Sequence, residues 1–206
     1  MKNKVKMRKW ALLAVSALLL VCVSVGATVA YLTAQDTVTN TFTVGKVAIT
    51  LDEAKVNADG TAVTPAERVK ENSYKLLPGH TYTKDPTVHV AAGSEDCWVF
   101  VKLENGIDKY EAATTEDGYK TISDQITANG WTALDGVTGV YYKNYTSNIA
   151  DVDMVVFNQF KTADNAESVE GWQSAANAKV TVTAYAVQAD GFDTANAAWD
   201  AAKFEN

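Results

Sequence analysis

A strict two-residue alternation near the N-terminus constrains the fold of this chain more than any other feature. Between residues 32 and 44 the odd positions are all polar and the even positions mostly apolar. The apolar residues are Leu32, Ala34, Val38, Phe42 and Val44, interrupted by Asp36 and Asn40. Successive side chains of a strand point to opposite faces, so this pattern predicts a half-buried strand with threonines on the other face. After Gly45 the apolar residues fall on odd positions, from Val47 to Leu51, which indicates a bulge or bend before a second strand.

Residues 1–30 have the three parts of a secretory signal peptide. A basic stretch that ends at Trp10 precedes an uncharged run from Ala11 to Ala30. Thr28 and Ala30 are the small residues that a signal peptidase requires before a cut between Ala30 and Tyr31. We therefore expect an N-terminal signal helix over residues 1–30 that is removed from the mature protein.

Membrane anchoring and lipidation are the two alternative fates of the leader. Its uncharged run is about as long as a membrane-spanning helix, so an uncleaved leader would anchor the protein in the membrane. Lipidation of Cys22 is disfavoured, because Val21 stands where a small residue would be expected. Cleavage after Ala30 is the favoured prediction, and it leaves membrane contact only to an uncleaved leader.

Charge and cysteine content exclude several classes of protein. The formal net charge is −7, and the leader carries only basic residues, so the mature protein is more acidic still. Such a surface repels phosphate backbones, which argues against nucleic acid as a partner. With Cys22 in the leader, the mature chain keeps only Cys97 and cannot form an internal disulfide. Its stability must come from packing and backbone pairing.

The rest of the chain reads as one β-rich domain over residues 31–206. Further strands are predicted after Pro86, where Val88 and Val90 alternate with His89, and at residues 97–103, 140–145, 154–160 and 179–189. Apolar residues occupy both faces of the run 97–103, so both faces are expected to be covered. Residues 53–74 are predicted to be a loop or short hairpin. Strands of this number separated by turn signals imply an antiparallel β-sandwich.

Two short helices interrupt or follow the predicted strands. Ile122 and Ile126 recur at helical spacing before the Asn129-Gly130 turn signal. Near the C-terminus, Ala195, Ala198, Trp199 and Ala202 share one helical face, and Asp193 or Thr194 can cap that helix. The predicted fold is therefore mainly β, with short helical insertions and a short C-terminal helix.

Several segments resemble the TasA/camelysin family of secreted Gram-positive proteins. The resemblance lies in ATVAYLT followed by NTFTVGKVAITLDE, in residues 76–104 (LLPGHTYTKDPTVHVAAGSEDCWVFVKLE), and in residues 179–192 (KVTVTAYAVQADGF). It covers both ends and the middle of the chain and is weak across residues 105–178. It implies a jelly-roll sandwich, a leader cut by the dedicated signal peptidase SipW, and a place at the cell surface or in the biofilm matrix.

The leading functional hypothesis is an extracellular structural protein. The resemblance implies subunits that assemble into fibres when the N-terminal segment of one copy completes a sheet in the next. Residues 31–44 have the required properties, because cleavage makes them terminal and their alternation suits pairing with an open sheet edge. Leu32, Val38, Phe42 and Val44 would fill pockets. The competing arrangement folds this strand back into its own domain.

An enzymatic alternative follows from the same resemblance, since camelysins are classed as metallopeptidases. A zinc peptidase helix places two histidines four residues apart beside a glutamate. Here the histidines, His80 and His89, are nine residues apart with Pro86 between them. We therefore expect two solvent-facing histidines in a β region, no metal site and no catalytic residues.

The remaining candidate residues are expected to be structural. Cys97 begins an apolar strand face, which predicts a small buried residue rather than a nucleophile. The acidic pairs Glu95-Asp96, Asp151/Asp153 and Asp190/Asp193 match no calcium loop, so no cofactor is expected. The aromatic residues Trp131, Tyr141, Tyr142, Tyr145 and Trp172 suit a core, although a sugar-binding surface on an adhesin-like module is a third hypothesis.

Overall fold

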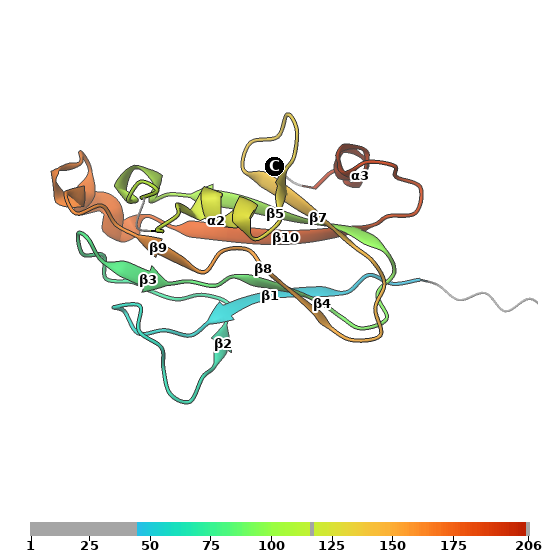
Figure 1. The fold of residues 1–206 in the computed structure, drawn as a ribbon, viewed down its shortest axis with the longest axis horizontal. Coiled ribbons are helices and arrows are strands. Elements are labelled where there is room, and N and C mark those ends of the chain that lie inside the picture. The colour runs from blue at the N-terminus through green and yellow to red at the C-terminus, as the bar shows by residue number, and fades with distance from the viewer. Residues whose placement is uncertain (1–44, 116–117, 205–206) are drawn as a thin grey trace, which may run out of the picture. The chain divides into compact units, whose positions relative to one another are not determined.

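The computed structural model describes residues 45–115 and 118–204, which form antiparallel sheets packed together with short helices (Figure 1). The strands are β1 (Ile49–Ala54), β2 (Arg68–Val69), β3 (Thr81–Thr83), β4 (Thr87–Val90), β5 (Cys97–Asn105), β6 (Thr132–Ala133), β7 (Val140–Tyr145), β8 (Val152–Val155), β9 (Gln159–Lys161) and β10 (Val180–Gln188). The α-helices are α2 (Ile122–Ala128) and α3 (Ala195–Ala202), and 3-10 turns occur at Asp108–Tyr110, Ala166–Ser168 and Trp172–Asn177. The mainly β prediction, with a short C-terminal helix, is confirmed.

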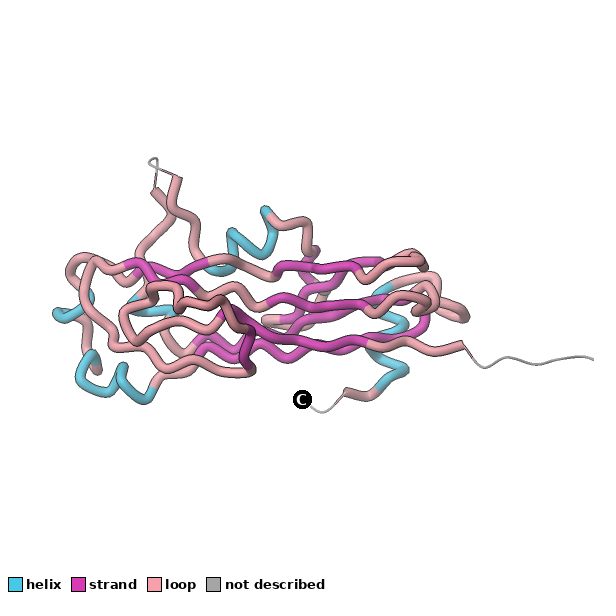
Figure 2. Tube along the Cα trace, turned by 90° about the horizontal axis from the view of Figure 1, so that it is seen from below, coloured by secondary structure: helices cyan, strands magenta, loops and turns pink. Residues whose placement is uncertain are grey.

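Two four-stranded sheets form the layers of the fold. The first has the order β2-β1-β4-β8 and the second the order β10-β5-β7-β6, with every pairing antiparallel. The chain crosses between the sheets after β4, again after β7, and a third time before β10. Figure 2 shows the strands running side by side, with their connections gathered at the two ends.

A two-stranded sheet, β3-β9, prolongs the pairing of β4 with β8. β3 precedes β4 and β9 follows β8, and two backbone hydrogen bonds join the segments between them. The Val156 amide donates to the Pro86 carbonyl (2.8 Å) and the Lys84 amide to the Asn158 carbonyl (3.1 Å). The single strand predicted over residues 154–160 is therefore wrong. Residues 156–158 separate β8 from β9, and the Val156 carbonyl accepts a hydrogen bond from Asn129 Nδ2 (3.1 Å) rather than from a neighbouring strand.

Two hydrophobic cores flank the second sheet. On its inner face, Cys97, Val99 and Val101 of β5 are fully buried against the first sheet. On its outer face, Phe100 packs against Trp199 of α3, with ring centroids 5.2 Å apart. The expectation that both faces of this strand are covered is confirmed, and α3 is the element that covers the outer one.

Both predicted short helices are present, α2 before Asn129 and α3 after its predicted cap. The Thr121 hydroxyl accepts the Asp124 amide (3.2 Å) at the start of α2, which ends just before Asn129. Thr194 caps α3 by accepting the Ala197 amide (3.2 Å), so it rather than Asp193 is the capping residue. None of the helices among the described residues has the length and apolar character needed to cross a membrane.

Candidate functional site

The core between the two sheets is closed along its centre and open along one side. Val88 and Val90 of β4 and Val99 and Val101 of β5 have no exposed surface. β1 and β10 are the next strands outward in their sheets, and their inward-facing residues are only half-buried. These residues are Ile49 and Leu51 on β1, and Val180, Val182, Ala184 and Ala186 on β10. Some Cα atoms of β1 and β10 lie within 8 Å of each other, so the apolar core between these strands is only partly open.

A groove of about 920 Å³ lies at this open side. One wall is formed by the end of β1 and the segment of residues 70–74, and the other by residues 178–182 at the start of β10. Its apolar lining includes Leu51, Val180 and Val182, together with Tyr74 from the first wall. Charged residues line it as well, among them Lys70, Glu71 and Lys179.

The free edge of β10 runs along the same side. β10 pairs with β5 over nine residues, from Val180 opposite Asn105 to Gln188 opposite Cys97. Bonds just outside this register join Gly106 N–H to the Lys179 carbonyl (2.8 Å) and Ala189 N–H to the Asp96 carbonyl (2.7 Å). Antiparallel bonding alternates, so odd-numbered residues of β10 bond to β5 and even-numbered ones direct their backbone groups away from it. Within the described residues no strand pairs with that second side.

Three of the polar side chains that line the groove, Glu53, Lys84 and Asn72, contact one another through a shared carboxylate. Glu53 and Lys84 are 4% and 9% exposed and form an ion pair. The other oxygen of the same carboxylate, Glu53 Oε1, accepts a hydrogen bond from Asn72 Nδ2 (2.9 Å). The hydroxyl of neighbouring Tyr74 donates to the Thr83 carbonyl (3.0 Å), and burial, then the charges of Glu53 and Asp85, raises the pKa of Tyr74 well above its ordinary value.

Glu53 and Asn72 were not expected at a site, because residues 53–74 read as a loop or hairpin, and Lys84 lies outside every predicted strand. One signal was present. Glu53 continues the odd-numbered series of Val47, Ile49 and Leu51, so it occupies an inward-facing position of β1. A carboxylate at such a position needs a buried partner, which Lys84 supplies.

The residues predicted to act during export and assembly lie outside the described part of the chain. They are Ala30 and Tyr31 at the cleavage site and Leu32, Val38, Phe42 and Val44 on the predicted donor strand. The first described residue, Gly45, lies against the Glu95 side chain. A β-carbon added at Gly45 would be only 2.9 Å from Glu95 Cγ.

The two histidines occupy separate sites. His80 Nε2 lies 2.8 Å from the Asp59 carbonyl, and its ring packs edge-on against Tyr82. His89 lies on β4, with one ring nitrogen on Asp52 and the other on Asp153. Among residues 45–115 and 118–204 no cluster of three His, Cys, Asp or Glu side chains is arranged to hold a metal ion.

His89 links three strands of the first sheet on its outer face. Its Nε2 lies 2.8 Å from Asp52 Oδ1 on β1, and its Nδ1 lies 2.6 Å from Asp153 Oδ1 on β8. Burial opposes the charged form, but the hydrogen bonds to both carboxylates outweigh it and raise the pKa of His89 above 6.5. Burial likewise raises the pKa of Asp52, but hydrogen bonds from His89 and Arg68 outweigh it and lower that pKa below 3.8.

Stability is expected to depend on His89 in a defined pH window. Because the pKa of His89 is raised on folding, its contribution is complete below its unfolded pKa of about 6.5 and is lost as the pH rises through the folded value. The contribution of Asp52 is present above about pH 4 and is lost as the pH falls through its lowered pKa. The difference in unfolding free energy between wild type and His89→Gln should therefore be largest between about pH 4 and 6.5. Urea unfolding at a series of pH values measures it, and a difference independent of pH would contradict the assignment.

Cys97 and the acidic residues Asp96 and Asp151 have structural roles. Cys97 is fully buried, and burial, then the charge of Asp96, raises the pKa of its thiol to about 11. It is therefore a poor nucleophile, as expected. Asp96 and Asp151 accept backbone amides of Ser147 (2.6 Å) and Ala92 (2.7 Å), and so stabilise the loops at one end of the sheets.

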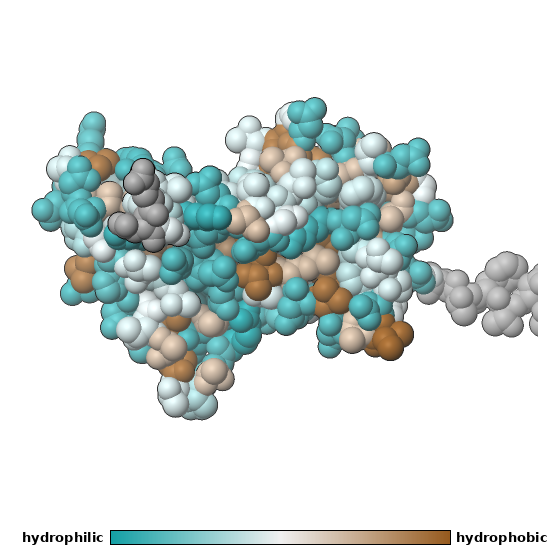
Figure 3. Space-filling view, viewed as in Figure 1, coloured by the Kyte–Doolittle hydropathy of each residue, from teal (hydrophilic) through white to brown (hydrophobic). Residues whose placement is uncertain are grey.

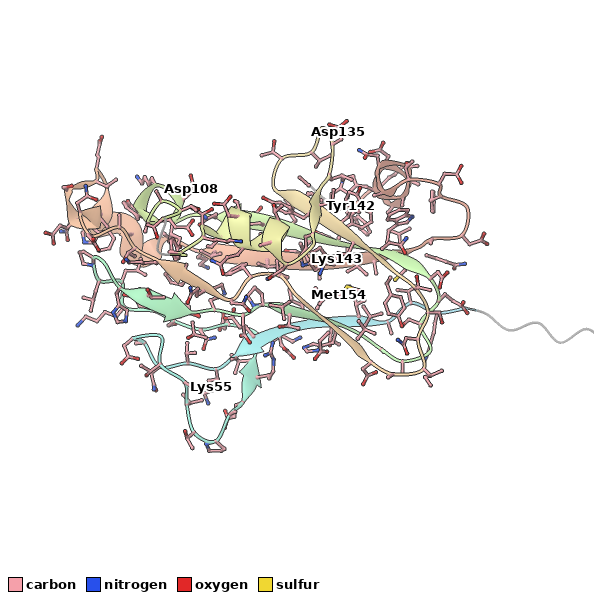
Figure 4. All side chains as sticks on the ribbon, viewed as in Figure 1. Lys55, Asp108, Asp135, Tyr142, Lys143 and Met154 are labelled. Atoms are coloured by element: carbon pink, nitrogen blue, oxygen red, sulfur yellow. The ribbon has the colours of Figure 1, made fainter. Side chains whose placement is uncertain are left out.

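The aromatic residues mostly belong to packed clusters. Trp131 is 1% exposed, and Lys143 of β7 lies 5.0 Å above its ring (Lys143 is labelled in Figure 4). Tyr145 is also buried, Tyr142 packs against Trp98, and Trp172 packs against Tyr110. On the face seen in Figure 3, hydrophilic residues predominate and apolar ones form separate patches.

Comparison with known proteins adds no assignment. No family model, no curated protein and no solved structure matches this chain. A proposal for function therefore depends on the half-open core, the free edge and the sequence itself.

Proposed function

We propose that this protein is a secreted structural subunit whose copies associate by strand addition. Residues 31–44 of one copy would add to the free edge of β10 in another and cover the open side of its core. The observation that carries the proposal is the nine-residue edge of β10, which has no partner among the described residues and borders half-buried apolar side chains. An unpaired edge of this length is a ready template for another chain.

The N-terminal segment has the chemistry that this edge requires. Residues 32–44 number thirteen, enough to pair along nine residues. Their apolar face supplies Leu32, Val38, Phe42 and Val44, while the threonines would face solvent. Full burial of one such large apolar side chain contributes about 1.5–3 kcal/mol, in addition to the backbone hydrogen bonds. Several of them together suffice for stable association.

The winding of the strands supports the family resemblance. The consecutive strands β4 and β5 pair with β8 and β7, so that a long two-stranded ribbon folds across both sheets. We propose that this is a jelly roll, with β1 and β10 on the same side of the ribbon. The proposal extends to export in a Gram-positive bacterium. There a SipW-type peptidase would remove residues 1–30 as a signal helix and expose Tyr31 outside the cell.

Deletion of residues 31–38 tests this function. The mature protein starting at Tyr31 is expected to form fibres, visible by electron microscopy and as fast-sedimenting species, and the deletion variant is expected to remain monomeric. The matched control replaces outward-facing threonines, Thr37→Ser and Thr39→Ser, and should assemble like wild type. Unchanged assembly of the deletion variant would exclude strand addition by this segment. A monomeric wild-type protein would instead indicate that the strand folds back onto its own domain.

A further inference from the structure

The polar cluster in the groove contains the groups needed to form an amide bond between two side chains of the protein. It contains a primary amine (Lys84), a carboxamide (Asn72) and a carboxylate (Glu53) that contacts both. The lysine and the carboxamide use different oxygens of that carboxylate, Oε2 and Oε1 respectively. The amine and the amide thus share one buried carboxylate, which brings both groups into the same small volume and favours a reaction between them.

The orientation of the Asn72 amide is fixed by its neighbours. Its Oδ1 accepts the backbone N–H of Val56 (3.0 Å), and its Nδ2 donates to the Ala54 carbonyl (2.8 Å) as well as to Glu53. A backbone N–H can only donate and a carbonyl can only accept, so the oxygen and nitrogen cannot be exchanged. The Val56 N–H polarises the carbonyl of Asn72 and would stabilise negative charge that develops on Oδ1.

We propose that Lys84 and Asn72 form an intramolecular amide bond, with Glu53 as the catalytic proton-transfer group. Lys84 Nζ passes a proton to Glu53 Oε2, and its lone pair attacks Asn72 Cγ. The Nζ–Cγ bond forms as negative charge moves onto Oδ1. Nζ loses two protons in all, one when it becomes the attacking amine and one after the new bond forms. Glu53 delivers one of them to Nδ2 as the Cγ–Nδ2 bond breaks, so that Nδ2 leaves as ammonia, and the other proton stays on Glu53 Oε2. No oxidant, reductant or other co-reactant is consumed.

Burial favours this reaction over hydrolysis. Glu53 and Lys84 are nearly inaccessible to solvent, so neither charge of the pair is well hydrated. Proton transfer from the ammonium to the carboxylate neutralises both charges. The free-energy cost of this transfer is therefore lower in a poorly hydrated site than in water. The aromatic rings of Tyr74 and Phe160 pack edge to face (5.3 Å between centroids) on the same groove and help to exclude water.

The bond would join two segments that line the groove. Asn72 lies in the irregular segment after β2, and Lys84 in the connection between β3 and β4. Eleven residues separate them in sequence. The amide would therefore fix one wall of the groove covalently to the first sheet, independently of any strand that the groove receives.

Mass spectrometry of the folded wild-type protein tests the proposal directly. The intact mass is expected to be lower by one ammonia than the mass calculated from the sequence of the same mature chain. Trypsin should release residues 71–75 joined to residues 76–102 as one branched species, because modified Lys84 is no longer cleaved. Recovery of an unmodified peptide 71–75 and cleavage after Lys84, in protein shown to be folded by circular dichroism, would overturn it.

Variants separate the roles of the three residues. Lys84→Arg keeps a cation beside Glu53 and should abolish the bond, and Glu53→Gln should slow its formation by about 100-fold or more. The matched control is Lys55→Arg, since Lys55 and Glu67 form an exposed pair (2.7 Å) on the projecting loop seen in Figure 4. It should cross-link like wild type. Loss of the bond in the control, or its persistence in Lys84→Arg, would also overturn the proposal.

Discussion

Replacing Ala184 with proline is expected to abolish assembly of the mature protein while leaving its fold intact. Ala184 lies near the middle of β10, at an even-numbered position whose N–H points away from β5. Proline has no N–H, and its ring occupies the space that an added strand would need. Proline is tolerated on edge strands when the missing donor faces outward, so pairing with β5 should persist.

Sedimentation velocity and electron microscopy measure the assembly, and circular dichroism with thermal unfolding measures the fold. Thr183→Ala is the matched control, because Thr183 is the neighbouring residue on the same strand and its side chain is exposed. It should assemble as wild type does. If Ala184→Pro formed normal fibres with an unchanged melting temperature, the second side of β10 would not be the edge that receives a strand.

Replacing Gln125 with leucine is expected to cause the largest loss of stability from a single polar residue. The Gln125 amide of α2 makes four hydrogen bonds to backbone groups and is 8% exposed. Its Nε2 donates to the carbonyls of Lys120 (2.7 Å) and Gln159 (2.8 Å), and its Oε1 accepts the amides of Asn158 (3.0 Å) and Gln159 (3.2 Å). It thus provides hydrogen-bond partners for backbone groups in the connection between β8 and β9.

Leucine has a similar size but leaves all four backbone groups without this partner. An unsatisfied buried polar group costs about 1–3 kcal/mol, and water can reach some of these groups, so the free energy of unfolding should fall by about 3–5 kcal/mol. Urea unfolding measures the loss. Ser123→Ala, on the exposed side of the same helix, should change stability by less than about 0.5 kcal/mol. A loss below about 1 kcal/mol for Gln125→Leu would show that the connection between β8 and β9 does not depend on this amide.

The interrupted strand shows where local patterns stop being informative. Residues 154–160 are rich in apolar residues and read as one strand, yet β8 ends at Val155 and β9 begins only at Gln159. The residue that compensates for the lost strand pairing is Gln125, which lies more than thirty positions earlier in the sequence. No pattern within residues 154–160 points to it.

The sequence by itself determined the elements whose burial pattern is periodic. The run of residues 97–103 predicted β5 and its two covered faces, and the spacing of Ile122 and Ile126 predicted α2. The threonine before Ala195 indicated the start of α3. These predictions succeed because the period of two or 3.6 residues is imposed by the geometry of the chain itself, without reference to any distant segment.

Only the tertiary structure decided which strands pair and which side chains converge. Glu53, Asn72 and Lys84 come from a strand, an irregular segment and a turn, and they meet because β1 pairs with both β2 and β4. The open side of the core likewise depends on strand order. β10 has inward-facing apolar residues such as Val182, as β5 does, but β10 lies at the edge of its sheet and they are only half-buried. Periodicity shows which face of a strand is apolar. The element that covers this face depends on pairing between distant parts of the chain, which local periodicity does not reveal.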